Sequence, residues 1–441
     1  MLGPRRYLLL VLTMLAIPMT TASQVRSDVE VPEAVVPSPL SLALALQIAR
    51  NRGLDVLIVD AQIRSAEGDT SVAIAIPNPA VTLGYGRALN YTSESSGQDN
   101  NQYTVGLSDQ AAIFDSLSGK RGLRLDVAHR ALAAARLSRS DALRRLEFQV
   151  KQQYALVVQG LEQVKFAEQV VETATKSLDL NRQRYPQVID EGALARIETQ
   201  KLEADQAYDQ AVLMLRSARV GLAFLLGARG DVPDFEVDVQ ALDYRVPERL
   251  VAATESGLLR IALEHRPDLL ESGFQRARAT AAVDLAKRQR FPDIGLSAQY
   301  TQTGTGQNAI QPPTIGFAVT APIPLLYQQQ GEIRKAEADY DVQSLTQARI
   351  VSQVLADVDT AYAGFVSAKH LVERMQRGLL ASAARARDVT EVQFKAGAGT
   401  LMDFLDAQRT FVSTKFEYLQ DVTTYWTAVY QLEQAVGMEL H

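Results

Sequence analysis

The sequence contains no cysteine among its 441 residues. This absence excludes a metal–thiolate site, a structural disulfide and a lipid anchor attached to cysteine. After the N-terminal segment there is no run of 18 or more consecutive apolar residues, so we expect no transmembrane helix. An exported protein of this size without disulfides fits a bacterial envelope, because a large core is stable without covalent cross-links.

Signatures of catalysis and cofactor binding are also missing. None of the four histidines (His129, His265, His370 and His441) belongs to an HExxH motif or a close i, i+4 pair. No glycine-rich phosphate loop follows an expected strand, and no GxSxG nucleophile motif occurs. The formal net charge is −6, and the sequence has no stripe of basic residues of the kind that a nucleic-acid binder carries. We therefore predict no enzyme, no cofactor, no bound metal ion and no nucleic-acid partner.

The N-terminus has the pattern of a secretory signal peptide. Arg5 and Arg6 precede an apolar stretch at residues 7–17, and small residues follow at 20–23. The sequence predicts a signal peptide over residues 1–23 and an extended leader over 24–39, since three prolines fall in residues 31–39.

The rest of the chain repeats one order of landmarks. QIARNRGLDVL at Gln47 corresponds to RIALEHRPDLL at Arg260, 213 positions later, and the glycine-containing segments at Gly192 and Gly397 lie 205 apart. A repeat this long is not a solenoid unit, whose period is about 20–50 residues. We interpret it as a duplicated half-protein, with a first repeat at residues 40–231, a linker at 232–254 and a second repeat at 255–441.

Each repeat is expected to hold two β-strands. Apolar and small or polar residues alternate over residues 81–87, 103–111, 294–301 and 315–321, with polar loops at 90–101 and 303–311. The alternation places Leu83, Leu296 and Phe317 on an apolar face, opposite a face of Gly, Ser and Thr. An ordinary half-buried sheet is one interpretation. The small polar face and the long polar loops instead favour an outer-membrane barrel.

Long helices account for the remainder. Apolar spacing predicts a helix over residues 40–74, and no proline occurs from 120 to 185 or after Pro324. A helix of about 60 residues is about 90 Å long. Such helices must pack lengthwise on their neighbours, as in coiled coils.

Four strands do not close a membrane barrel, because single-chain barrels begin at about eight strands. Lipid also forbids open sheet edges, since every backbone polar group there needs a partner. If the strands are inserted in a membrane, the barrel must therefore be shared among subunits.

With these features in place, the sequence resembles the TolC family of outer-membrane efflux channels, over residues 40–437. The resemblance is carried by HRPDLLESGFQRARATAAVDLAKRQRFPDIGLSAQY from His265 and FKAGAGTLMDFLDAQRTF from Phe394. APIPLLYQQQGEIRKAEADYD from Ala321 and GLSDQAAIFDSLSGKR from Gly106 are most similar to the heavy-metal-efflux (CzcC-like) branch.

The resemblance implies a mainly α-helical fold with a membrane β-barrel. A homotrimer would share one 12-stranded barrel and extend its helices as a coiled-coil α-barrel into the periplasm. It implies a channel in the outer-membrane lipid, docked to a periplasmic adaptor (membrane fusion) protein and an inner-membrane RND-type transporter that exports heavy-metal cations.

The resemblance also assigns site residues at the periplasmic entrance. Gly192 and Gly397 would form the turns at the hairpin tips, and Asp403 and Asp406 would ring the constriction, with Glu198 at the corresponding place in the first repeat. Residues three apart share a helix face, so both aspartates are able to face the lumen. As an alternative, these acids are solvated surface residues.

One departure concerns the gate. The best-known family member locks its closed state with a Tyr and an Arg, and here those positions hold Phe394 and Gly399. We therefore expect apolar packing by Phe394, and glycines that absorb backbone change, in place of that lock.

Other functions remain open from the sequence. A drug-efflux or type I secretion channel of the same family would share every feature above. A periplasmic adaptor would need a β-rich domain flanking a single helical hairpin. An envelope enzyme or polysaccharide-binding protein with coiled-coil arms would need no detergent for extraction.

Overall fold

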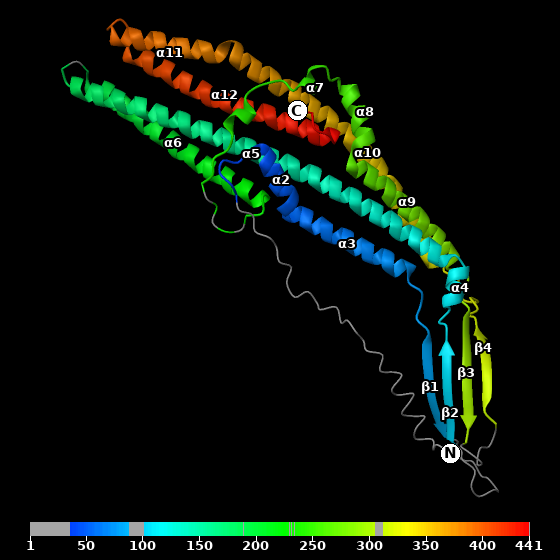
Figure 1. The fold of residues 1–441 in the computed structure, drawn as a ribbon. Coiled ribbons are helices and arrows are strands. Elements are labelled where there is room, and N and C mark those ends of the chain that lie inside the picture. Colours follow the sequence, from blue (N-terminus) through cyan, green and yellow to red (C-terminus); the bar gives the residue numbers. More distant parts are fainter. Residues whose placement is uncertain are drawn as a thin grey trace. The chain divides into compact units, whose positions relative to one another are not determined.

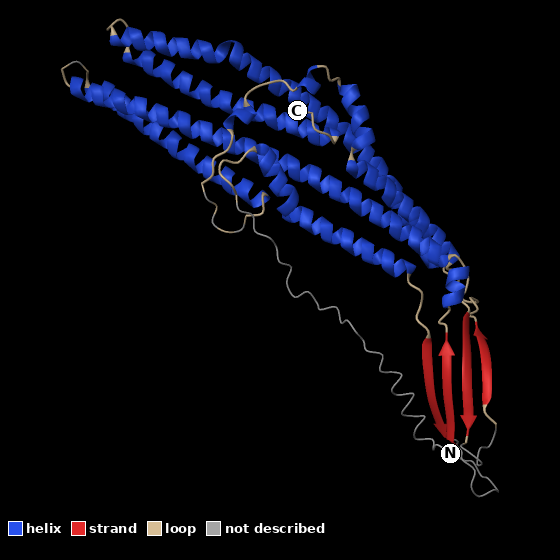
Figure 2. Ribbon diagram, viewed as in Figure 1, coloured by secondary structure: helices blue, strands red, loops and turns tan. Residues whose placement is uncertain are grey.

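The computed structural model describes residues 36–87, 101–187, 189–228, 230, 232, 234–304 and 312–440, all within the unit Ala34–His441. The predicted signal peptide, most of the leader and most of both polar loops lie outside the described residues. Helices dominate, and four strands form one small sheet (Figures 1 and 2).

The sheet consists of β1 (Ala80–Arg87), β2 (Asn101–Ser108), β3 (Gly295–Thr303) and β4 (Thr314–Thr320). The strands lie in the order β1-β2-β3-β4, and each pairs antiparallel with the next. All four predicted strands are confirmed, although the expected end of the second at residue 111 is wrong. Gln110 and Ala111 have φ of 50° and 62°, and the Asp109 carboxylate accepts the Ala111 N–H at 3.0 Å, so the chain turns there.

The register brings the apolar side chains to one face. Val81 pairs with Leu107 and Leu83 with Val105, while Ala298 pairs with Phe317. Neighbours across strands point the same way, so their apolar side chains share a face. The opposite face carries small or polar side chains, including Thr82, Gly84, Thr104, Gly106, Ser297, Gln299, Gly316 and Ala318.

The predicted helix over residues 40–74 is in fact two helices, α2 (Leu42–Arg52) and α3 (Leu54–Ile74). Gly53 lies between them, and a Cβ there would lie 2.6 Å from the Ala49 carbonyl oxygen. A corresponding break at Arg266 separates α8 (Glu255–His265) from α9 (Pro267–Arg288). Proline at the first position of α9 is favourable, because its missing N–H has no helical partner there.

The predicted long helix after residue 120 is confirmed as α5 (Lys120–Arg184), which follows the short α4 (Ala112–Leu117). Its 65 residues span about 98 Å. It packs along α3, α9, α12 (Leu401–Val436) and α6 (Glu191–Leu225), so it is the central element of the helical region (Figure 1).

The helices after Pro324 are α10 (Gln330–Arg374), α11 (Leu380–Lys395) and α12. A π-helical segment, Met375–Leu379, joins α10 to α11, and the Leu380 N–H donates to the carbonyl of Met375. The order helix, helix, strand, strand, long helix, returning helix thus occurs twice. The domain boundaries expected from the sequence stay a prediction. Among the described residues, no helix has the length and apolar composition needed to cross a bilayer.

The core is richest where the connection between the halves packs on α5 and α12. Trp426 is buried and donates from Nε1 to the carbonyl of Leu242 at 2.9 Å. Tyr154 is also buried, donates its hydroxyl to the Leu40 carbonyl at 3.0 Å, and accepts from the Asp238 N–H. Burial raises the pKa of Tyr154 to about 12. The 3-10 helix Val239–Leu242 is therefore fastened to the long helices, and α7 (Glu248–Val251) follows it.

A buried ionic cluster joins α9, α10 and α12. The Arg266 guanidinium binds Asp268 at 2.6 Å, Asp357 at 2.8 Å and the Ala435 carbonyl at 3.2 Å. Although burial alone would raise the pKa of Asp268, the hydrogen bonds and charge of Arg266 lower it. Arg266, at the break before α9, is thus bonded to both α10 and α12.

Candidate functional site at the hairpin tips

The first hairpin turns between α5 and α6. Asp190 caps α6, since its carboxylate accepts the Ala193 N–H at 2.7 Å. The helix therefore begins at Glu191, and Gly192 lies in its first turn without a positive φ. The tip turn therefore lies before Gly192, which corrects the expectation that Gly192 forms that turn.

The second hairpin turns between α11 and α12, and here a glycine is required. Gly397 has φ of 71°, the left-handed region that favours glycine. The N–H groups of Ala398 and Gly399 both donate to the Gln393 carbonyl, at 2.9 and 3.1 Å. Gly399 has no positive φ, but a Cβ on it would lie 3.0 Å from that of Gln393. Both glycines therefore permit a tight turn.

Phe394 packs inside its own hairpin. Its ring stacks on Phe404 of α12, with centroids 5.8 Å apart and an interplanar angle of 1°. Both rings are half-buried. The pair clamps the end of α11 to the start of α12, next to the turn at Gly397. Its role in gating stays a prediction.

The two predicted aspartates lie in the first two turns of α12. Thr400 caps the helix, accepting the Asp403 N–H at 3.1 Å, and its hydroxyl donates to the Asp403 carboxylate at 2.6 Å. Asp406 is exposed and lines a cleft. In the described part of the chain, neither carboxylate has an ion-pair partner, whereas Glu198 accepts from Arg182 at 2.9 Å.

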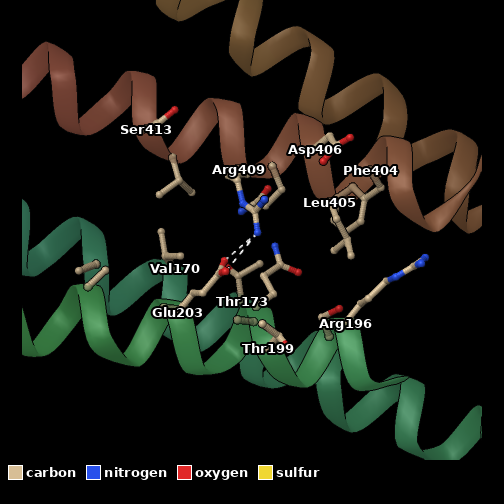
Figure 3. A pocket seen from close by; sticks show the side chains of 18 of the residues that line it. Val170, Thr173, Arg196, Thr199, Glu203, Phe404, Leu405, Asp406, Arg409 and Ser413 are labelled. Atoms are coloured by element: carbon tan, nitrogen blue, oxygen red, sulfur yellow. Dashed lines mark hydrogen bonds and ion pairs between the residues drawn. The ribbon is translucent and has the colours of Figure 1, made fainter. Parts of the chain in front are cut away.

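The cleft has a volume of about 530 Å³ and lies between α5, α6 and α12. Figure 3 shows Asp406 and Leu405 from α12 on one side, and Arg196 and Thr199 from α6 on the other. One ion pair spans it, between Arg409 and Glu203 at 3.0 Å (Figure 3). An exposed pair of this kind contributes roughly 0.2–1 kcal/mol. The hairpins also meet through the Phe166 ring of α5, which packs edge-on against Phe411 and Phe416 of α12.

Sequence reasoning missed two further acids on α12, Glu417 and Asp421. They lie 11 and 15 positions after Asp406, close to three and four helical turns, so they fall near the same helix face. Burial, together with the charge of Glu417, raises the pKa of Asp421. Neither acid forms an ion pair within the described residues. The sequence alone could have predicted both acids, because their spacing from Asp403 and Asp406 is close to whole helical turns.

In the residues that the structure describes, no group of three or more His, Cys, Asp or Glu side chains is placed to hold a metal ion. The cleft at the tips instead carries charges of both signs, Asp406 and Glu203 beside Arg196 and Arg409.

The chain is similar to known proteins over most of its length. A family model described as "Outer membrane efflux protein" matches residues 45–228 and 258–438. The cobalt-zinc-cadmium resistance protein CzcC of Cupriavidus metallidurans is 25% identical over 411 residues, which cover 90% of each chain. The pyoverdine export outer membrane protein OpmQ of Pseudomonas putida is 25% identical over 416 residues, covering 89% of this chain and 84% of that protein.

Among solved structures, CusC superposes with a TM-score of 0.74 at 17% identity. The match covers 93% of this chain and 99% of that one. At this identity, the likeness establishes the fold alone.

Proposed function

The chain belongs to the outer membrane efflux protein family, and from that premise we propose that it is the outer-membrane channel of a tripartite export system. Three copies share one 12-stranded barrel, and their helices form a tunnel in the periplasm. The tunnel receives cargo from an inner-membrane RND-type transporter through a periplasmic adaptor protein. The family and its solved relatives are channels rather than enzymes.

The observation that carries this proposal is the distribution of side chains on the sheet. The apolar face is exposed: Leu83 is 54%, Leu296 42% and Phe317 84% accessible. Exposed apolar patches of this kind mark interaction surfaces, and alternation of apolar and small polar residues is typical of lipid-facing and lumen-facing sides. We propose that these three residues face lipid.

The open edges of the sheet support the trimer. Strands β1 and β4 each have one unpaired side within the described sheet. Lipid does not tolerate unpaired backbone groups, so pairing with other copies is required once the sheet is inserted. A detergent-solubilised monomer whose strand signal by circular dichroism is intact would refute this assembly.

The acidic face of α12 supports cations as cargo. In a trimer, three copies of Asp403 and Asp406 would form acidic rings at the entrance, with Glu198 near them. Glu417 and Asp421 would extend the negative potential along the tunnel. A conduit works by weak contacts, because tight binding would slow exit. The resemblance to a cobalt-zinc-cadmium resistance protein agrees with divalent metal cations as cargo.

The main alternative is a different cargo for the same channel, such as a drug, a secreted protein or pyoverdine. A pyoverdine export protein matches this chain at the same 25% identity, which supports this alternative. A periplasmic adaptor is disfavoured, because the family match covers both halves of the chain.

Conductance in planar bilayers tests the entrance. Asp403→Ala combined with Asp406→Ala should reduce cation selectivity and weaken block by multivalent cations. Asp209→Ala is the matched control, since Asp209 is exposed on α6 and does not line the cleft. Reversal potentials and block that are unchanged in the double variant would place these acids outside the pore.

A further inference from the structure

A group of apolar side chains is exposed where the sheet meets the helices. In the connection from β4 to α10, Ile323 is 74%, Leu325 79% and Leu326 100% accessible. In α4, which follows β2, Ile113 is 53% and Leu117 76% accessible. These five residues, called the apolar collar below, follow the second strand of each strand pair, at the same end of the sheet (Figure 1).

Polar contacts tie the α4 part of the collar to α5 and form local turns in the other part. In α4, the buried Asp115 binds Arg124 of α5 through two hydrogen bonds of 2.7 Å. Ile113 and Leu117 are four residues apart and share a helix face. In the other part, the Leu325 N–H donates to the Ile323 carbonyl at 2.8 Å, and the Gly331 N–H donates to the Tyr327 hydroxyl at 3.1 Å. The exposed apolar side chains of the collar therefore lie in hydrogen-bonded, ordered segments.

Charges lie next to the collar on the side of the helices. Arg290 is exposed, and Arg334 and Lys335 are exposed in the second turn of α10. In the described residues, none of these three side chains forms an ion pair. One carboxylate, Glu332 in the first turn of α10, is also exposed and accepts the Tyr327 hydroxyl. Apolar side chains followed by cations are the arrangement that interfacial segments present to a bilayer, with the apolar part at the acyl boundary and the cations at lipid phosphates.

We propose that the apolar collar enters the interface of the membrane leaflet at the helical end of the sheet, and that the neighbouring cations bind lipid phosphate. This inference rests on the proposed function, because it needs the apolar sheet face to be in lipid. The collar segments follow directly on β2 and β4, two of the strands that carry that face. It would fix the depth of the barrel and keep the barrel from sliding along the membrane normal.

The absence of cysteine makes a direct test available. Leu326→Cys, labelled with an environment-sensitive fluorophore, is reconstituted in liposomes that contain phosphatidylglycerol. The lipids carry bromine either near the headgroup end or near the methyl end of the acyl chain. We expect blue-shifted emission and a loss of most of the fluorescence with bromine near the headgroup. Bromine near the methyl end should quench less.

Two control positions separate this inference from the proposed function. Phe317→Cys, on the sheet face, should be quenched by lipid bromine, and Ala381→Cys, exposed on α11, should not be. If Phe317→Cys is quenched but Leu326→Cys is not, the collar lies outside the membrane, and the channel proposal stands. A blue shift at Leu326→Cys without quenching would mean that protein covers the collar, which also overturns the inference. If neither position is quenched, the proposed function fails as well.

Discussion

The close packing of α5 on α6 at Gly160 gives the sharpest stability prediction. A Cβ on Gly160 would lie 3.0 Å from the Cα and 3.2 Å from the Cβ of Leu215. Both residues are buried, and Leu215 is 7% accessible. The Gly160→Ala variant therefore requires the two helices to separate by a few tenths of an ångström along a long shared contact.

Two effects oppose each other in this variant. Alanine gains about 1 kcal/mol over glycine in helix propensity, while overpacking a filled contact costs about 1–3 kcal/mol. At Gly364, within α10, an added Cβ would meet no atom within 4 Å, so Gly364→Ala should stabilise by about 0.5–1 kcal/mol. Because the propensity gain is common to both, the difference between the variants isolates the contact cost.

The assay is thermal unfolding in detergent, followed by circular dichroism at one scan rate. Gly160→Ala should melt below Gly364→Ala, and Gly160→Leu should melt lower still. A difference of 1 kcal/mol shifts the midpoint by about 2–4 °C in a domain of 150–250 residues, and by less in a larger protein. Equal midpoints for the two alanine variants would show that α5 and α6 have free room at this point.

Three further predictions concern the sheet, the tip and the ionic cluster. Leu296→Arg should cost about 2–4 kcal/mol if Leu296 lies at the bilayer midplane, and normal insertion with unchanged heat stability would argue against lipid exposure. Phe394→Ala should raise basal conductance, and Phe404→Ala should have the same effect because the two rings stack; wild-type conductance in both variants would exclude the pair from gating. The lowered pKa of Asp268 means that its contribution to stability is present above its unfolded pKa and is lost as the pH falls through the folded value. Asp268→Asn should therefore reduce stability near neutral pH and flatten the acid loss measured by thermal unfolding.

Period-two alternation located all four strands, because a sheet with one apolar face imposes that period on the sequence. It failed at the end of β2, where the Asp109 carboxylate and two left-handed residues turn the chain. That event depends on one side chain binding local N–H groups, which alternation does not record. The break at Gly53 was missed for a related reason. Apolar spacing continues across it, and only the structure shows that a Cβ at Gly53 would lie 2.6 Å from the Ala49 carbonyl oxygen and 2.9 Å from Cδ2 of Leu146.

The tip was predictable in part. The family resemblance assigned Asp403 and Asp406, which the structure places in the first two turns of α12; their role at the constriction stays a prediction. The contact between Arg409 and Glu203 joins residues 206 positions apart, so no local pattern reveals it. Gly192 was misplaced because the Asp190 cap, rather than the glycine, determines where α6 begins.

The π-helical segment Met375–Leu379 makes the two hairpins mechanically unequal. In the first half, one uninterrupted helix leads from the end of the sheet to the tip. In the second half, the corresponding path crosses a stretch whose hydrogen bonding shifts to i→i+5. A twisting load applied at the tips would pass along α5 with little loss, whereas α10 and α11 would yield at this joint. In the proposed trimer, stiff and compliant helical paths would alternate around the ring, so a rotation imposed at the entrance would be absorbed at the three π-helical segments.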